Sequence, residues 1–143
     1  MRPTLLTTLC EPSRRIATVA LGTVAALGML SAPAQASTYN SHLTGAGPGF
    51  ESTRWNDNGG ATNIKFTGCT DDYSNQRVSV RLRKDTFGPD PSYTNASFTQ
   101  CFVSSSSTSS GNWDDHGSGE YYFVVNDALV GVHVWVKSLT VTY

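Results

Sequence analysis

Hydrophobic and polar residues alternate repeatedly along the chain after residue 36, and this pattern predicts β-strands. The clearest example is Arg77–Arg83, in which Val78, Val80 and Leu82 face one way and polar residues face the other. Successive side chains of a strand point to opposite faces, so the pattern is typical of a strand with one buried face. No window after residue 36 has the 3.6-residue period of an amphipathic helix.

Four further segments have strand patterns and are separated by turn-forming residues. They are Thr62–Phe66, Ser97–Val103, Glu120–Val125 and Val132–Tyr143. In the last segment the parity of the apolar positions flips, which predicts a β-bulge near Lys137–Ser138. Short alternating strands divided by turn signals favour an antiparallel sandwich or a small barrel. We expect an all-β fold, a small antiparallel β-sandwich.

Two polar segments interrupt the strands and are predicted to be loops. Lys84–Ser92 contains glycine and two prolines, whereas Ser104–Gly119 is of low complexity and rich in serine and glycine. We expect the second segment to be a mobile, exposed loop. Since Trp113 lies in it, we expect Trp113 to be the most exposed tryptophan, and we expect Trp55 to be buried.

The first 36 residues are organised as an export signal. Three arginines precede the apolar run Ile16–Leu30, and Ala34–Ala36 forms an A-x-A cleavage site. The apolar run is shorter than the roughly 20 residues that a membrane-spanning helix needs. We therefore expect residues 1–36 to be a cleaved signal peptide and the mature protein to be secreted and extracellular, with an uncleaved membrane anchor as the alternative.

Removal of the signal peptide leaves 107 residues, which is enough for one compact domain. The whole chain has 10 basic and 11 acidic side chains; the signal peptide takes three arginines and one glutamate, which leaves a net charge of −3. This balance excludes the basic surface typical of nucleic-acid binders. We expect an extended N-terminal arm at 37–50 and a single β-sandwich domain at 51–143.

Two cysteines, Cys69 and Cys101, remain after cleavage. In an exported protein an isolated pair predicts a disulfide, because the compartment is oxidising. The closed loop of about 32 residues would be worth roughly 3–4 kcal/mol in the chain-entropy model. Two thiols without neighbouring histidines disfavour a zinc site, and we expect no metal and no cofactor.

The chain contains none of the common catalytic motifs, such as GxSxG, HExxH, a Walker sequence or CxxC. Asp114–Ser118 is the one place where a histidine meets acids and hydroxyls. A hydrolytic triad needs these groups on a rigid frame, so a solvated acidic loop is the favoured interpretation. We predict that the protein is not an enzyme.

Oxygen ligands suited to calcium occur in two turns. Their spacing fits no EF-hand loop, and Asp and Asn are common turn residues, so the turn role is favoured. The residues are Asp57, Asn58, Asp71, Asp72 and Asn75.

Two other groups of side chains could form binding surfaces. Arg77, Arg81, Arg83 and Lys84 form a basic stripe that could meet an acidic partner, although a solvated outer sheet face is favoured. The tryptophans could stack on sugar rings, and Trp113 is the most exposed candidate.

The segment Ser37–Leu43 alternates weakly, and the glycine-rich stretch Gly45–Gly49 then breaks the pattern. The segment could be the first strand of its own sheet, with a bulged crossover at the glycines. It could also be an exposed arm that adds to the sheet edge of another protein. Both alternatives stay open.

A signal peptide, a single small β domain, the stretch GFESTRWNDNGG (Gly49–Gly60), the strand IKFTGC (Ile64–Cys69) and a second strand cysteine resemble one family. They are similar to the small B subunit of the umbrella toxin particles secreted by filamentous actinobacteria. The resemblance implies a non-catalytic adaptor that links a large repeat-containing toxin subunit to lectin-bearing subunits, with its N-terminal segment inserted into a repeat. Carried over by position, this role falls on Ser37, Thr38, Tyr39, Asn40, Ser41, His42 and Leu43.

Two alternative functions remain. The first is a secreted inhibitor of an extracellular protease or glycosidase, with Lys84–Tyr93 as an inhibitory loop stiffened by its prolines. The second is a carbohydrate- or cell-wall-binding module that uses Trp113 and nearby tyrosines. In every case we expect no contact with nucleic acid, and none with a membrane after signal cleavage.

Overall fold

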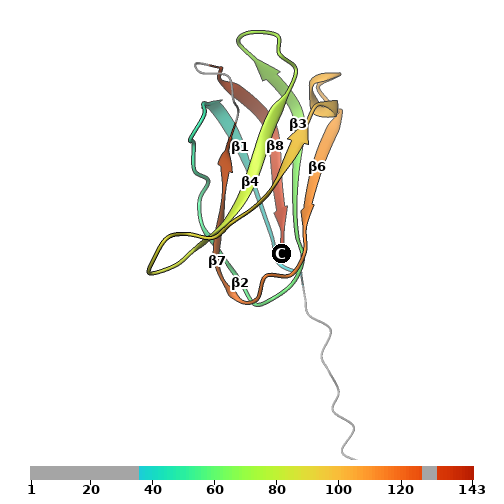
Figure 1. Cartoon of the computed structure of the whole chain (residues 1–143). Coiled ribbons are helices and arrows are strands. Elements are labelled where there is room, and N and C mark those ends of the chain that lie inside the picture. The colour runs from blue at the N-terminus through green and yellow to red at the C-terminus, as the bar shows by residue number, and fades with distance from the viewer. Residues whose placement is uncertain (1–35, 127–131) are drawn as a thin grey trace, which may run out of the picture. The chain divides into compact units, whose positions relative to one another are not determined.

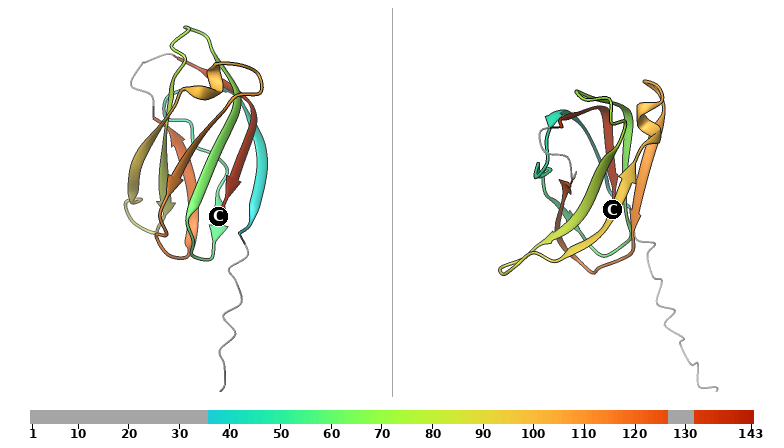
Figure 2. Two further views of the ribbon diagram at one scale, coloured as in Figure 1. Left: turned by 90° about the vertical axis from the view of Figure 1, so that its right-hand side faces the viewer. Right: turned by 45° about the horizontal axis from the view of Figure 1, so that its top comes forward.

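The computed structural model describes residues 36–126 and 132–143, so the predicted signal peptide lies outside the described residues except for Ala36. The described residues form two antiparallel sheets packed face to face, as Figures 1 and 2 show. The prediction of an all-β antiparallel sandwich is therefore confirmed.

The described residues contain eight strands and one short 3-10 helix. In chain order these are β1 (Thr38–Ala46), β2 (Trp55–Asp57), β3 (Thr62–Asp71), β4 (Val78–Asp85), β5 (Ser92–Phe98), η1 (Gln100–Phe102), β6 (Thr108–Trp113), β7 (Gly119–Val125) and β8 (Val134–Thr142).

The two sheets have four strands each, in the orders β1-β8-β3-β6 and β2-β7-β4-β5. All neighbouring strands are antiparallel. The edge strands of the first sheet are β1 and β6, and those of the second are β2 and β5. Since rings of β1 and β2 are in contact and a β6 side chain bonds to β5, the sheets meet at both lateral edges.

The core lies between the sheets and is built from the alternate apolar residues of each strand. Phe66 of β3 makes edge-to-face contacts with Phe98 of β5 and Phe123 of β7, with ring centroids 4.8 and 5.8 Å apart. All three rings are fully buried. Such pairs stabilise a core by more than the burial of their area alone.

Cys69 of β3 and Cys101 of η1 form the predicted disulfide, with a Cα–Cα distance of 5.0 Å. The prediction of Ser97–Val103 as one strand is wrong, however. The strand ends at Phe98, and Cys101 lies in η1, where its N–H donates to Ser109 Oγ at 2.9 Å. The disulfide and this bond hold the turn against the first sheet.

The serine-rich segment is not one exposed loop, which corrects the sequence prediction. Residues 108–113 form β6, which pairs with β3 and buries Ser109, Gly111 and Trp113 on its inner face. A Cβ on Gly111 would lie 2.7 Å from the Cβ of Ala96, so only glycine permits this approach of β6 to β5. Two of the three inward-facing residues of β6 are serine and glycine, so the sequence lacks the alternation of apolar and polar residues that indicates a strand.

The expected exposure of the tryptophans is half confirmed. Trp55 is 4% exposed, as predicted, but Trp113 is only 3% exposed. Its indole Nε1 donates to the carbonyl of Thr94 on β5 at 2.7 Å. The ring therefore closes the β5–β6 edge of the sandwich and is not available to stack on a sugar.

The N-terminal segment is the first strand of its own sheet. β1 pairs with β8, and its residues Leu43 and Ala46 belong to the core. Between the pairs Ser41–Leu139 and Leu43–Val136, β8 carries one extra residue, which confirms the bulge predicted near Lys137–Ser138. The segment 37–50 is folded back on its own domain and does not hang free.

Candidate binding surfaces

The connection between β4 and β5, residues 86–91, projects from the body of the sandwich (Figures 1 and 2). It coincides with the proline-containing segment that the sequence singled out as a possible inhibitory loop. Its base is closed by a hydrogen bond from the Lys84 N–H to the Pro91 carbonyl at 3.1 Å. We call residues 86–91 the hairpin tip.

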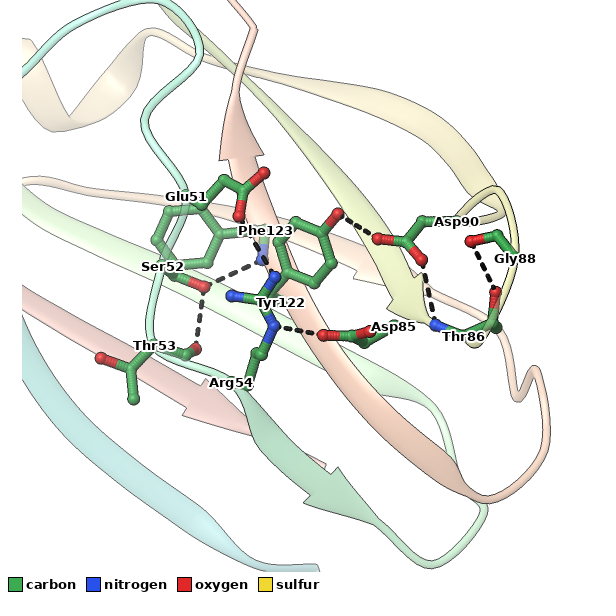
Figure 3. Close-up of polar contacts among 10 residues, drawn as sticks. All are labelled: Glu51, Ser52, Thr53, Arg54, Asp85, Thr86, Gly88, Asp90, Tyr122 and Phe123. Carbon is green, nitrogen blue, oxygen red and sulfur yellow. Dashed lines mark hydrogen bonds and ion pairs between the residues drawn. The ribbon is translucent and has the colours of Figure 1, made fainter.

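Asp90 holds the hairpin tip in one conformation, as Figure 3 shows. Its carboxylate accepts from the Thr86 N–H at 3.0 Å and from the Tyr122 hydroxyl at 2.7 Å. Its carbonyl accepts from Arg83 Nη2 at 3.3 Å. The carboxylate thus links the loop to itself and to β7, in the way that Asx side chains stabilise turns.

Arg54 covers Tyr122 on the outer face of the second sheet (Figure 3). Its guanidinium carbon lies 4.4 Å from the centre of the Tyr122 ring. Its Nε donates to Asp85 at the base of the hairpin tip, and its Nη2 lies 3.2 Å from Glu51. The segment before β2 therefore braces β4 through one side chain.

Burial and hydrogen bonds in this network shift the pKa values of Tyr122 and Asp90. Burial, followed by the hydrogen bond to Asp90, raises the pKa of Tyr122 to about 12. The bond from Tyr122, followed by that from the Thr86 N–H, lowers the pKa of Asp90. Asp90 is thus ionised and Tyr122 neutral at physiological pH, which is the pairing that the hydroxyl-to-carboxylate bond requires.

Phe87 stands at the end of the hairpin tip, and its side chain is fully exposed, at 111% of the reference area. The neighbouring residues Thr86, Gly88 and Pro89 are also exposed, and none of them carries a charge. A rigid loop therefore presents an uncharged aromatic ring to solvent.

A second surface is the free edge of β1. Ser37 and Tyr143 exchange both backbone hydrogen bonds, at 2.6 and 2.9 Å. In an antiparallel pair such residues alternate with residues whose backbone groups point outward. The N–H and C=O groups of Thr38 and Asn40 therefore point away from β8.

A groove of about 540 Å³ runs beside this edge, between β1 and the segment 53–56. Tyr39, Trp55 and Tyr143 form its aromatic side, with ring centroids about 6 Å apart. Trp55 Nε1 is buried and has no hydrogen-bond partner among the described residues. Burial raises the pKa of the Tyr39 phenol, and its interaction with the Ser52 hydroxyl offsets part of that rise.

A third surface is a hollow of about 650 Å³ on the outer face of the first sheet. It is lined by His42, Trp135 and Lys137, together with Ser104 and Ser105 of the turn after η1. Trp135 is one of the tryptophans that could stack on sugar rings, and its position between inward-facing valines indicates an outward side chain. It is 39% exposed, and so it replaces Trp113 as the candidate for stacking.

The predicted partner-binding residues are divided between these surfaces. Thr38, Asn40 and Ser41 are exposed on β1, Tyr39 faces the groove, and His42 faces the hollow. Leu43 belongs to the core, so it can anchor β1 to its own sheet only.

The structure does not combine the three histidines of the chain into one site. The His116 ring stacks on Tyr93 with centroids 3.8 Å apart, and Asp115 accepts from the Gly117 N–H within the same turn. His133 lies against Asp72, with a ring-to-carboxylate distance of 2.9 Å, and its N–H donates to the same carboxylate. The backbone bond from His133 is the main reason why the pKa of Asp72 is lowered.

The calcium candidates act as turn residues. Asp57 Oδ1 accepts from the Gly59 N–H at 2.8 Å, and Asp71 Oδ2 accepts from the Gln76 N–H at 2.7 Å. Within residues 36–126 and 132–143, no three His, Cys, Asp or Glu side chains lie close enough together to hold a metal ion.

Three of the four side chains of the basic stripe, those of Arg81, Arg83 and Lys84, form hydrogen bonds within the domain. Arg81 Nε donates to Asn95 Oδ1 of β5 at 2.7 Å, and Arg83 reaches the carbonyl of Asp90. Lys84 donates to the carbonyl of His116 at 3.1 Å. The stripe therefore braces the second sheet and the hairpin.

Among the described residues, no helix is both long and apolar enough to cross a membrane. Comparisons with protein-family models, curated proteins and solved structures gave no match to this chain.

Proposed function

We propose that the protein is a secreted, non-catalytic adaptor that holds two other proteins together. In the family that its sequence resembles, those partners are a large repeat-containing toxin subunit and a lectin-like subunit of an antibacterial toxin complex. The observation that carries the proposal is the free edge of β1, where Thr38 and Asn40 direct backbone donors and acceptors away from β8. The dispersal of the three histidines supports a role without catalysis.

The edge would bind the large subunit by strand addition. An extended segment of that subunit pairs with the outward groups of β1, so that main-chain hydrogen bonds supply affinity and side-chain pockets supply specificity. The groove beside β1 gives the added strand room.

A point variant tests this proposal better than a deletion, because deletion of Ser37–Leu43 would remove Leu43 from the core. Asn40→Pro removes an outward N–H and leaves the bonds of the flanking residues to β8 in place; edge strands tolerate proline at such positions. Asn40→Ala is the matched control, since both variants lose the bond from Thr140 Oγ1 at 2.8 Å.

The experiment is a native pull-down from the culture medium of the producing organism, with the mature protein tagged at its C-terminus. We expect a large repeat-containing protein to be recovered with the natural protein and with Asn40→Ala, and to be lost with Asn40→Pro. If folded Asn40→Pro recovers that protein undiminished, binding through the β1 edge is refuted.

The second candidate function is inhibition of an extracellular protease or glycosidase, and the braced hairpin tip favours it. A preorganised loop loses little entropy on binding, which is what inhibitory loops use. An inhibitor needs one contact surface, whereas an adaptor needs two. Assays against a panel of secreted proteases and glycosidases test this candidate, and the absence of inhibition across the panel would remove it.

A further inference from the structure

We infer that the hairpin tip is a preformed anchor that inserts Phe87 into an uncharged, apolar pocket on a protein partner. The inference deepens the proposed adaptor function, on which it rests, because it identifies the second of the two contact surfaces.

The first observation behind this inference is the exposure of the Phe87 side chain. Single exposed apolar side chains are normal on protein surfaces, so what distinguishes Phe87 is the degree of its exposure. Phe87 is 111% exposed, so its ring receives essentially no cover from its own domain. Tyr73 and Val103, at 67% and 72%, are each partly covered. The ring is therefore free to enter a pocket on a partner, and aromatic residues, phenylalanine among them, are enriched in protein interfaces.

The second observation is that hydrogen bonds and prolines fix the conformation of the hairpin tip. Thr86, immediately before the phenylalanine, donates its N–H to the Asp90 carboxylate, which also accepts from the Tyr122 hydroxyl (Figure 3). The Asp90 carbonyl accepts from Arg83 Nη2. Pro89 and Pro91 restrict the backbone between these contacts. The conformation is therefore set before a partner arrives, which reduces the entropy lost on binding.

The charges around the tip identify the kind of partner. Between residues 86 and 91 the only charged side chain is Asp90, and its carboxylate is turned inward and engaged. Arg54 and Asp85 are paired with each other at the base. An uncharged tip fits an apolar pocket that has no charge at its mouth, since a charge there would be desolvated without compensation.

A protein pocket fits these observations better than a membrane. Surface binding to a bilayer uses several apolar residues together with basic side chains directed at the headgroups. The tip offers one ring, and the nearby basic residues Arg83 and Lys84 point into hydrogen bonds with Asp90 and His116.

The two contact surfaces lie at opposite edges of the sandwich. β1 contacts β2 on one side, through Tyr39 and Trp55, whereas β5 contacts β6 on the other, through Thr94 and Trp113. The hairpin joins β4 to β5, and so it extends from the edge opposite β1. The free backbone groups of β1 and the hairpin tip therefore belong to different strands and different sheets.

Photo-crosslinking tests the inference directly. The mature, C-terminally tagged protein is prepared with p-benzoylphenylalanine in place of Phe87, and a control carries it in place of Tyr73. Each is irradiated in the culture medium of the producing organism, and crosslinked peptides are sequenced. We expect residue 87 to crosslink to apolar residues of one protein, and residue 73 to give no such product. Equal crosslinking at both positions, no crosslinking, or crosslinking to lipid would overturn the inference.

Two point variants separate this inference from the proposed function. Phe87→Ala should reduce recovery of the crosslinked protein about tenfold or more, as expected for an anchor residue, and should leave recovery of the β1 partner unchanged. Asn40→Pro should do the reverse. If Phe87→Ala changes neither recovery and Asn40→Pro abolishes one, the anchor is refuted and the adaptor function stands. If only Phe87→Ala has an effect, the anchor stands and the adaptor function fails.

Discussion

The replacement of Trp113 by alanine distinguishes most sharply between the sequence pattern and the folded structure. An exposed loop tryptophan could be removed at little cost. Trp113, however, is 3% exposed, and its Nε1 donates to the Thr94 carbonyl at 2.7 Å. The variant therefore tests whether the serine-rich segment is a strand that closes the sandwich.

The expected loss of stability follows from the buried area. A tryptophan buries roughly 150–250 Å², which at about 25 cal/mol per Å² is about 4–6 kcal/mol as an upper estimate. Measured changes of Trp to Ala in cores cost about 3–5 kcal/mol. Since a small domain has a total free energy of unfolding of about 5–15 kcal/mol, Trp113→Ala should lose a large part of it.

Urea unfolding, followed by far-UV circular dichroism with the disulfide intact, measures this loss. Trp135→Ala is the matched control, because that ring is 39% exposed on the outer face of the first sheet. We expect it to cost about 1 kcal/mol or less. Trp113→Phe keeps most of the apolar volume and serves if the alanine variant fails to fold. A difference of less than about 1 kcal/mol between the two alanine variants would refute the buried position of Trp113.

Three further predictions concern titration and the disulfide. In a spectrophotometric titration one tyrosine should ionise at a pKa of about 12, and Tyr122→Phe should remove that component. The depressed pKa of Asp90 implies a stabilising contribution that is fully present above its unfolded value and is lost as the pH falls through the folded value. Between about pH 6 and pH 2.5 the urea midpoint of Asp90→Asn should therefore fall less than that of the natural protein. The double replacement Cys69→Ala and Cys101→Ala opens a 32-residue loop and should cost about 3.7 kcal/mol in the chain-entropy model, measured by urea unfolding. A cost below about 1 kcal/mol would contradict that account of the disulfide.

The candidate surfaces could be predicted from the sequence only in part. The prolines of the hairpin and the exposed polar residues of β1 were visible as patterns. The role of Asp90 in fixing the hairpin tip was not visible in the sequence. Its partners Thr86 and Tyr122 lie 4 and 32 positions away, and only folding brings Tyr122 near. The outward position of Trp135 was visible in the alternating strand, but its greater exposure than Trp113 was not, because the burial of Trp113 depends on β5.

The sequence by itself determined the class of fold, the disulfide and the bulge in β8. These follow from local alternation and from the small number of cysteines, and alternation survives wherever large apolar residues mark the inner face, as in β4. Only the tertiary structure decided that residues 108–113 form a strand and that the N-terminal segment pairs with β8. Serine and glycine lie on the inner face of β6, so local hydrophobicity gives no signal there. That face is buried because Gly111 lies close to Ala96 of β5 and Trp113 donates to the Thr94 carbonyl of the same strand. Since β5 belongs to the opposite sheet, the local sequence pattern gives no sign of these contacts.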